Sequence, residues 1–154
     1  MVISIHIGSS VLAIISGAFV LLLNKGDRWH IILGRVYAVS MITLAAVSFG
    51  IYEVTGSFYI FHAISIQSLF FTLAGLCLSR FLRTQISQWI IWHGRFMVYS
   101  YITLIVTGIA QFFDQLPFEN TTLRAIVFLS IPAITGWALY EFWKVPQLKL
   151  ESPQ

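Results

Sequence analysis

The sequence predicts an all-α integral membrane protein, a single bundle of five transmembrane helices. Three observations lead to this prediction: high apolar content, low charge content, and five apolar stretches long enough to cross a bilayer. Of the 154 residues, 58% are hydrophobic and 10% charged, whereas a soluble domain has about 45–50% and about 25%. Mean hydropathy is +0.84. This composition excludes a disordered chain, a nucleic-acid-binding module and an ordinary soluble enzyme.

A helix needs about 20 apolar residues to span about 30 Å of hydrocarbon. Five stretches meet this requirement: 5–23, 30–52, 59–79, 89–113 and 123–143. The connections between them are short, so we expect one transmembrane domain over 1–143 and a polar tail over 144–154. The first stretch lacks a basic leader and a following small-residue cleavage site, which favours a permanent helix over a cleaved signal.

Small residues mark where these helices are expected to pack closely. The first stretch carries Ser9, Ala13 and Gly17 at four-residue spacing, and the second carries Ala46 and Gly50. Such stripes let the backbones of neighbouring membrane helices approach each other. In the fifth stretch, Pro132 is expected to kink the helix.

Charged residues near the ends of the stretches predict the orientation. Lysines and arginines gather in the first connection, the third connection and the tail: Lys25, Arg28, Arg80, Arg83, Lys144 and Lys149. The second and fourth connections carry Glu53, Asp114 and Glu119, and Arg124 is the one exception. Because basic residues favour the cytoplasmic side, we expect the N-terminus outside and the C-terminus in the cytoplasm. Four tryptophans fall at the expected cytoplasmic interface: Trp29, Trp89, Trp92 and Trp143.

An internal repeat relates the second stretch to the fourth. Residues 34–44 align with residues 94–104, with Gly, Arg, Ser, Ile, Thr and Leu in common. A Trp-His pair precedes each copy, Trp29-His30 and Trp92-His93. The pattern predicts a duplicated helix pair with both copies running in the same direction, followed by one extra helix.

The four histidines are the main candidates for chemistry, because each belongs to a different predicted helix. The orientation places His6 and His62 near the outer surface, and His30 and His93 near the cytoplasmic one. At a rise of about 1.5 Å per residue, the two depths differ by about 20–25 Å, so the pairs cannot share one ion.

Neutral imidazole is a ligand for haem iron, zinc and copper. Two imidazoles from facing helices can hold a haem iron from both sides, and one such site near each membrane face is typical of two-haem cytochromes of the b type. The leading specific hypothesis is therefore a haem b protein for membrane electron transfer, with a membrane redox partner. No Lys or Arg lies near the outer pair, which weakens the case for haem there.

Arg35 and Arg95 occupy equivalent positions in the repeat, near the predicted inner histidine pair. An arginine at this depth extends its guanidinium to the interface, makes a structural bond within the protein, or contacts an anion such as a haem propionate or a lipid headgroup. Glu141, near the end of the fifth stretch, is expected to be a solvated interfacial group.

Other interpretations remain open at this point. The histidines can be structural, bonding the backbone of neighbouring helices in a non-enzymatic membrane subunit or assembly factor. The expected protein partner is a membrane redox protein or, in a homo-oligomer, a second copy of the chain. They can also bind a transition metal or relay protons. The sequence shows no phosphate-binding glycine loop, Ser-His-Asp set, His-Glu-x-x-His pair or mid-span acid, so it identifies neither an enzyme nor a proton-coupled transporter.

The motifs resemble those of a known group, the bacterial predicted membrane proteins of domain-of-unknown-function family 2306. The resemblance covers roughly residues 5–115. It is carried by His6, Lys25-Gly26, His30-x-x-x-Gly34-Arg35-Val36-Tyr37, Met41, Phe61-His62 and His93-Gly94-Arg95-Phe96-Met97. In that family an Arg often follows the second histidine, whereas Ile31 follows His30 here. The resemblance implies a small multi-pass protein of the bacterial cytoplasmic membrane, in contact with the lipid bilayer, and supplies no activity.

Overall fold

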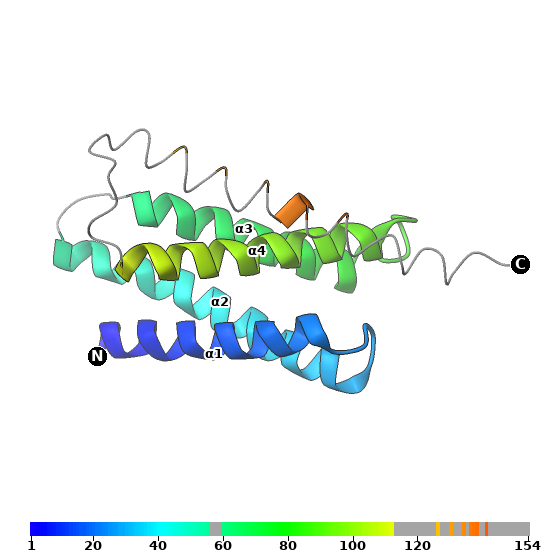
Figure 1. Cartoon of the computed structure of the whole chain (residues 1–154), viewed down its shortest axis with the longest axis horizontal. Helices are drawn as coiled ribbons and strands as arrows, with labels where there is room; N and C mark the ends of the chain where they lie inside the picture. Colours follow the sequence, from blue (N-terminus) through cyan, green and yellow to red (C-terminus); the bar gives the residue numbers. More distant parts are fainter. Residues whose placement is uncertain are drawn as a thin grey trace, which may run out of the picture. The chain divides into compact units, whose positions relative to one another are not determined.

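The computed structural model describes residues 1–55 and 60–112, together with residues 126, 130, 134, 136–138 and 141. Four helices are present: α1 (Val2–Leu22), α2 (Arg28–Thr55), α3 (Ile60–Arg80) and α4 (Trp89–Phe112) (Figure 1). Their limits lie close to those of the first four predicted stretches. No strand occurs in these described residues. Most of the fifth predicted stretch, 123–143, with Pro132, lies outside the described residues.

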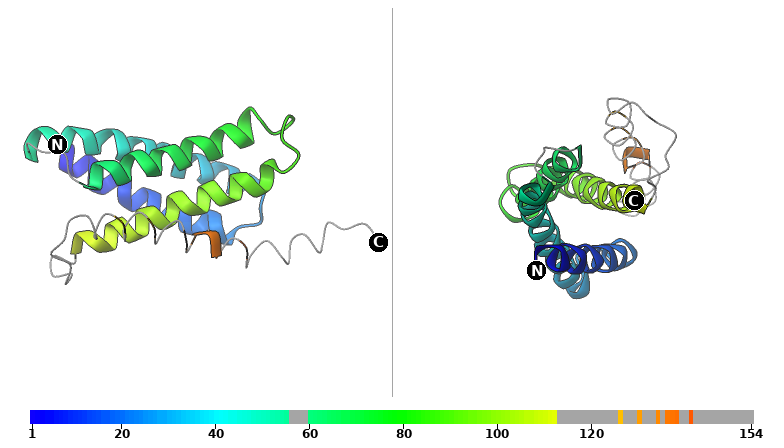
Figure 2. Two further views of the ribbon diagram at one scale, coloured as in Figure 1. Left: turned by 90° about the horizontal axis from the view of Figure 1, so that it is seen from above. Right: turned by 90° about the vertical axis from the view of Figure 1, so that its left-hand side faces the viewer.

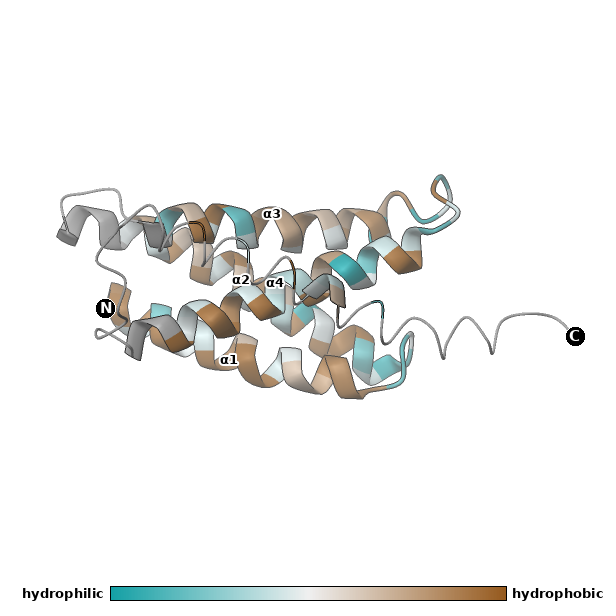
Figure 3. Cartoon of the chain, turned by 45° about the horizontal axis from the view of Figure 1, so that its top comes forward, coloured by the Kyte–Doolittle hydropathy of each residue, from teal (hydrophilic) through white to brown (hydrophobic). Residues whose placement is uncertain are grey.

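Three helices are long and apolar enough to cross a membrane: Val2–Leu22, Arg28–Gly50 and His62–Arg80. The described part of α4 is not among them. In Figure 3 the helices are largely brown and pale, and the hydrophilic colour gathers at the turns that join α1 to α2 and α3 to α4. These properties are those of a membrane protein.

The chain divides into two compact units, Met1–Thr72 and Leu73–Gln154, which we describe separately. In the first unit, α1 and α2 form an antiparallel hairpin (Figures 1 and 2). Gly26 in the turn has a φ of +84°, which only glycine adopts without strain. The ammonium of Lys25 donates to the carbonyls of Val20, Leu21 and Leu23 and so caps the end of α1.

The α1 face of this hairpin is built from small residues, as the sequence predicts. Ser9, Ala13, Ser16 and Gly17 are buried, and no part of Ala13 is exposed. The hydroxyl groups of Ser9 and Ser16 donate to the carbonyls of Ile5 and Leu12, four residues earlier. The hydroxyl groups of both serines thereby have their hydrogen-bond partners within their own helix, and the packing surface stays flat.

On α2 the predicted stripe is only half right. Ala46 is exposed, whereas its neighbour Ala45 is 4% exposed. The buried face of α2 runs through Tyr37, Ala38, Met41, Ala45 and Ser48. The prediction failed because small size alone does not show which side of a uniformly apolar helix faces protein. Gly50 does face α1, with its Cα beside Val2.

In the second unit, the last turns of α3 lie beside the first turns of α4. At Gly75 the two helices approach closely, and the carbonyl of Gly75 bonds one of the candidate histidines. Ser100 and Thr103 of α4 are fully buried, and Thr103 donates to the carbonyl of Tyr99 in its own helix.

Candidate functional site

The four histidines belong to four different helices: His6 to α1, His30 to α2, His62 to α3 and His93 to α4. The first three lie in the first unit, and His93 lies in the second together with Arg95. We describe each within its own unit.

His6 and His62 are placed at the same end of the first unit. The ring of His62, which is 5% exposed, lies beside the ring of Phe49 near the end of α2, with 6.1 Å between their centroids. The next residue, Gly50, faces the start of α1, because a Cβ there would lie 3.6 Å from Cγ1 of Val2. Val2 precedes His6 by about one helical turn. The same turn of α2 thus lies beside the beginnings of both α1 and α3.

One ring nitrogen at this end has no partner within the described part of the chain. Nδ1 of His6 is buried and makes no hydrogen bond with a described residue. Leaving a buried polar group unsatisfied costs about 1–3 kcal/mol. A group that bonded this nitrogen would remove that cost.

His30 bonds the backbone of the preceding helix. Its Nδ1 lies 3.3 Å from the carbonyl oxygen of Val20, across the hairpin. A carbonyl only accepts hydrogen bonds, so Nδ1 is the protonated nitrogen in this contact. The bond is slightly longer than a typical N–H···O contact.

His93 repeats this arrangement at the junction of α3 and α4. Its Nδ1 donates to the carbonyl of Gly75 at 2.7 Å, and the ring lies 6.4 Å from that of Trp89, centroid to centroid. His30 and His93 therefore each lie in the first turns of a helix and bond a backbone carbonyl near the end of the preceding helix. The carbonyls come from unrelated residues, Val20 and Gly75, so no shared motif in the sequence indicates them.

Arg95 makes a structural ion pair, which is one of the roles that the sequence left open for it. The residue is 8% exposed. Its guanidinium forms an ion pair with the carboxylate of Glu141. It also stacks on two tryptophans, 4.9 Å from the ring centroid of Trp92 and 4.2 Å from that of Trp137.

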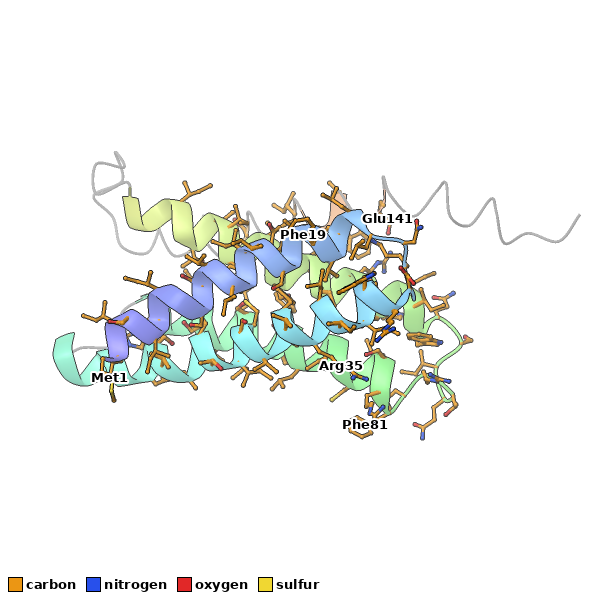
Figure 4. All side chains as sticks on the ribbon, turned by 90° about the horizontal axis from the view of Figure 1, so that it is seen from below. Met1, Phe19, Arg35, Phe81 and Glu141 are labelled. Carbon is orange, nitrogen blue, oxygen red and sulfur yellow. The ribbon has the colours of Figure 1, made fainter. Side chains whose placement is uncertain are left out.

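Glu141, labelled in Figure 4, is partly exposed and is also one half of an ion pair, which the sequence did not predict. Its carboxylate is bound by Arg95, and 37% of its side chain is exposed. Glu141 follows Trp137 by four residues, which is one helical turn, so both reach the same guanidinium. The four-residue spacing of Trp137 and Glu141 was the signal in the sequence that both side chains share one helix face.

Arg35, at the equivalent position of the repeat, is exposed on α2 (Figure 4). The repeated Gly-Arg pair thus has two environments, because the segment that supplies Glu141 and Trp137 to Arg95 lies outside the repeat. Gly34, beside Arg35, has open space around it: a Cβ there would meet none of the described residues within 4 Å.

Within the described residues, no group of three or more His, Cys, Asp or Glu side chains is arranged to hold a metal ion. Cys77 is exposed on α3 and has a free thiol. No protein-family model, no curated protein and no solved structure matches the chain.

Proposed function

We propose that the chain is a membrane-embedded haem b protein that takes part in electron transfer within the bacterial cytoplasmic membrane. In this proposal it has five spans with the N-terminus outside and the C-terminus in the cytoplasm, and it belongs to the uncharacterised family 2306 that its motifs resemble. A membrane redox partner supplies or accepts the electron.

The observation that carries the proposal is that one turn of α2 contacts both His62 and Val2, one helical turn before His6, with a buried nitrogen of His6 lacking a partner among the described residues. Haem iron suits such a pair because the porphyrin supplies four ligands and the protein needs only two. A bound haem would supply one-electron chemistry at a potential set by its ligands and surroundings.

The other two histidines add support from their hydrogen bonds. Histidine ligands almost always donate the ring N–H that is not bound to metal, often to a backbone carbonyl. His30 and His93 both do this through Nδ1, which is the arrangement expected of ligands that bind through Nε2. Arg35 is the propionate contact that we propose, whereas at Arg95 a propionate would compete with Glu141.

The test is an absorbance spectrum of the protein purified in mild detergent after expression with ample haem. We expect a Soret band and split bands after dithionite reduction. His62→Ala and His6→Ala should each abolish or halve the Soret absorbance per protein. Ser10→Ala is the matched control, since Ser10 bonds only its own helix. A featureless spectrum from folded, haem-replete protein would remove the proposal.

A second candidate function is a non-enzymatic membrane subunit whose histidines fasten helices together. The bonds from His30 to Val20 and from His93 to Gly75 favour it as well. Here His30→Gln and His93→Gln should each lower the free energy of unfolding by about 0.5–1.5 kcal/mol and leave partner binding intact. Elemental analysis of the same sample separates both candidates from a zinc or copper protein.

A further inference from the structure

At position 75 the close approach of α3 and α4 leaves little room for a side chain. A Cβ on Gly75 would lie 2.6 Å from Sδ and 3.1 Å from Cγ of Met97, and 3.6 Å from Cβ of Phe96. The first separation is shorter than real Cβ contacts and the second is tight, so a larger residue at position 75 requires the Met97 side chain to move. By contrast, a Cβ on Gly108 of α4 would meet none of the described residues within 4 Å.

This close approach brings a backbone carbonyl to a histidine ring. The Gly75 carbonyl accepts from Nδ1 of His93 at 2.7 Å. A carbonyl oxygen has two lone pairs, so it can accept this bond in addition to its helical one. Because the oxygen cannot donate, Nδ1 must carry the proton, and in the neutral ring Nε2 then carries the lone pair.

The resulting tautomer is the less common one. Neutral imidazole in water favours the proton on Nε2, so the Gly75 carbonyl must hold the ring in the alternative form. Within the described residues, no hydrogen bond reaches Nε2 of His93. Trp89 lies beside the ring and restricts its rotation further.

We propose that Gly75 is the positioning residue of His93: it sets the Nδ1–H tautomer and presents Nε2 as an electron-pair donor to a metal ion or haem iron. The tautomer is a property of the chain without any bound group, whereas the role of Nε2 as a ligand atom rests on the proposed function. Gly75 itself contacts no ligand and acts through His93.

The experiment is nitrogen NMR on the full chain in lipid nanodiscs, with ¹⁵N-labelled histidine and no haem. It is recorded near pH 8, above the usual histidine pKa of about 6.5, so that the rings are neutral. The nitrogen shifts distinguish protonated from unprotonated ring nitrogens. His93→Gln, which removes one ring from the spectrum, assigns the His93 signals.

We expect His93 of the unmodified protein to be protonated on Nδ1. Gly75→Ala should cause loss of this form and the appearance of the Nε2–H form, because the added methyl group pushes against Met97. Gly75→Ala combined with Met97→Ala should restore the original signals, because it removes the atoms that clash. Gly108→Ala is the matched glycine control and should leave the signals unchanged.

Two results would overturn the inference: a His93 ring protonated on Nε2 in the unmodified protein, or unchanged His93 signals in Gly75→Ala. If Gly75→Ala does not fold, the unmodified protein and the double variant still decide the matter. The absence of haem absorbance, with the tautomer as expected, would remove the proposed function and leave the assignment of Gly75 standing.

Discussion

Arg95 shows how a charged side chain is accommodated near the start of an apolar helix. Its planar guanidinium stacks on Trp92 and Trp137 and binds the carboxylate of Glu141. Arginine suits such a site because its charge is delocalised and weakly hydrated, which makes removal from water less costly than for lysine. The pair therefore holds the helical turn of Trp137 and Glu141 against α4.

Glu141→Gln should lower the free energy of unfolding. Removing one partner of a fully buried pair costs about 3–5 kcal/mol, but 37% of the Glu141 side chain is exposed, so solvent screening reduces the effect to about 1–3 kcal/mol. Denaturant titration of the detergent-solubilised protein measures the change.

The double variant Arg95→Gln with Glu141→Gln should be less destabilised than the sum of the two single variants, since neither then leaves an uncompensated charge. Arg83→Gln removes an exposed arginine from the turn after α3 and is the matched control, with an expected change within about 0.5 kcal/mol. If the losses of unfolding free energy in the two single variants simply added up in the double variant, the assigned ion pair would be contradicted.

At the scale of the element, α1 has two distinct long faces. Small residues, including Ala13, are buried against α2, and large apolar residues such as Leu12, Ile15 and Phe19 are exposed. This is the reverse of a soluble amphipathic helix, which buries its large apolar side chains. The arrangement follows when the surrounding solvent is lipid, because packing then depends on close backbone contact.

Ala13→Leu should destabilise the α1–α2 hairpin by about 1–3 kcal/mol, because the added atoms have no space in a closely packed contact. Ala46→Leu makes the same chemical change at an exposed position of α2, where we expect a change within about 0.5 kcal/mol. Unfolding of the two variants in detergent compares them directly. Equal losses of unfolding free energy in the two variants would show that Ala13 and Ala46 have similar environments, and would contradict the close packing at Ala13.

Leu12→Asp tests whether the exposed face of α1 contacts lipid. Leu12 is 55% exposed near the middle of the helix. If this face contacted water, an aspartate at position 12 would cost little. At the centre of a bilayer an aspartate costs about 2.5–3.5 kcal/mol. We therefore expect a clear loss of membrane insertion, measured by the membrane-integrated fraction, with Leu12→Ala as the control. Normal insertion of Leu12→Asp would argue against a spanning α1.

At the scale of the whole molecule, the number of membrane spans determines on which side of the membrane the C-terminus lies. A chain with five spans has its ends on opposite sides of the membrane, and one with four has them on the same side. The basic residues Lys25, Arg28, Arg80 and Arg83 predict that the α1–α2 and α3–α4 turns lie in the cytoplasm.

Cysteine labelling tests this orientation, because Cys77 is the only native cysteine. In a Cys77→Ser background, Asn24→Cys and Thr84→Cys should react with a membrane-impermeant maleimide only after the cells are opened. Gln115→Cys, in the predicted outer connection, should react in intact cells. Labelling of Asn24→Cys or Thr84→Cys in intact cells would reverse the predicted orientation.

The positions of the helices were predictable from the sequence, and so was the distribution of the histidines over them. Helical hydrogen bonds are local, and a bilayer requires long apolar runs, so the limits of α1 to α4 follow from hydropathy and from polar residues in the turns. The small-residue face of α1 was predictable for the same reason, since Ser9, Ala13 and Gly17 repeat at nearly the helical period.

Only the tertiary structure decided which partners the candidate residues bind. Glu141 is 46 residues from Arg95, and Gly75 is 18 residues from His93, distances at which spacing along the chain carries no geometric information. Ala45 rather than Ala46 is buried because the rotation of an apolar helix is set by its neighbours and not by its own hydropathy. Two arginines with the same motif therefore have different environments: Arg35 is exposed, and Arg95 is held by a segment outside the repeat.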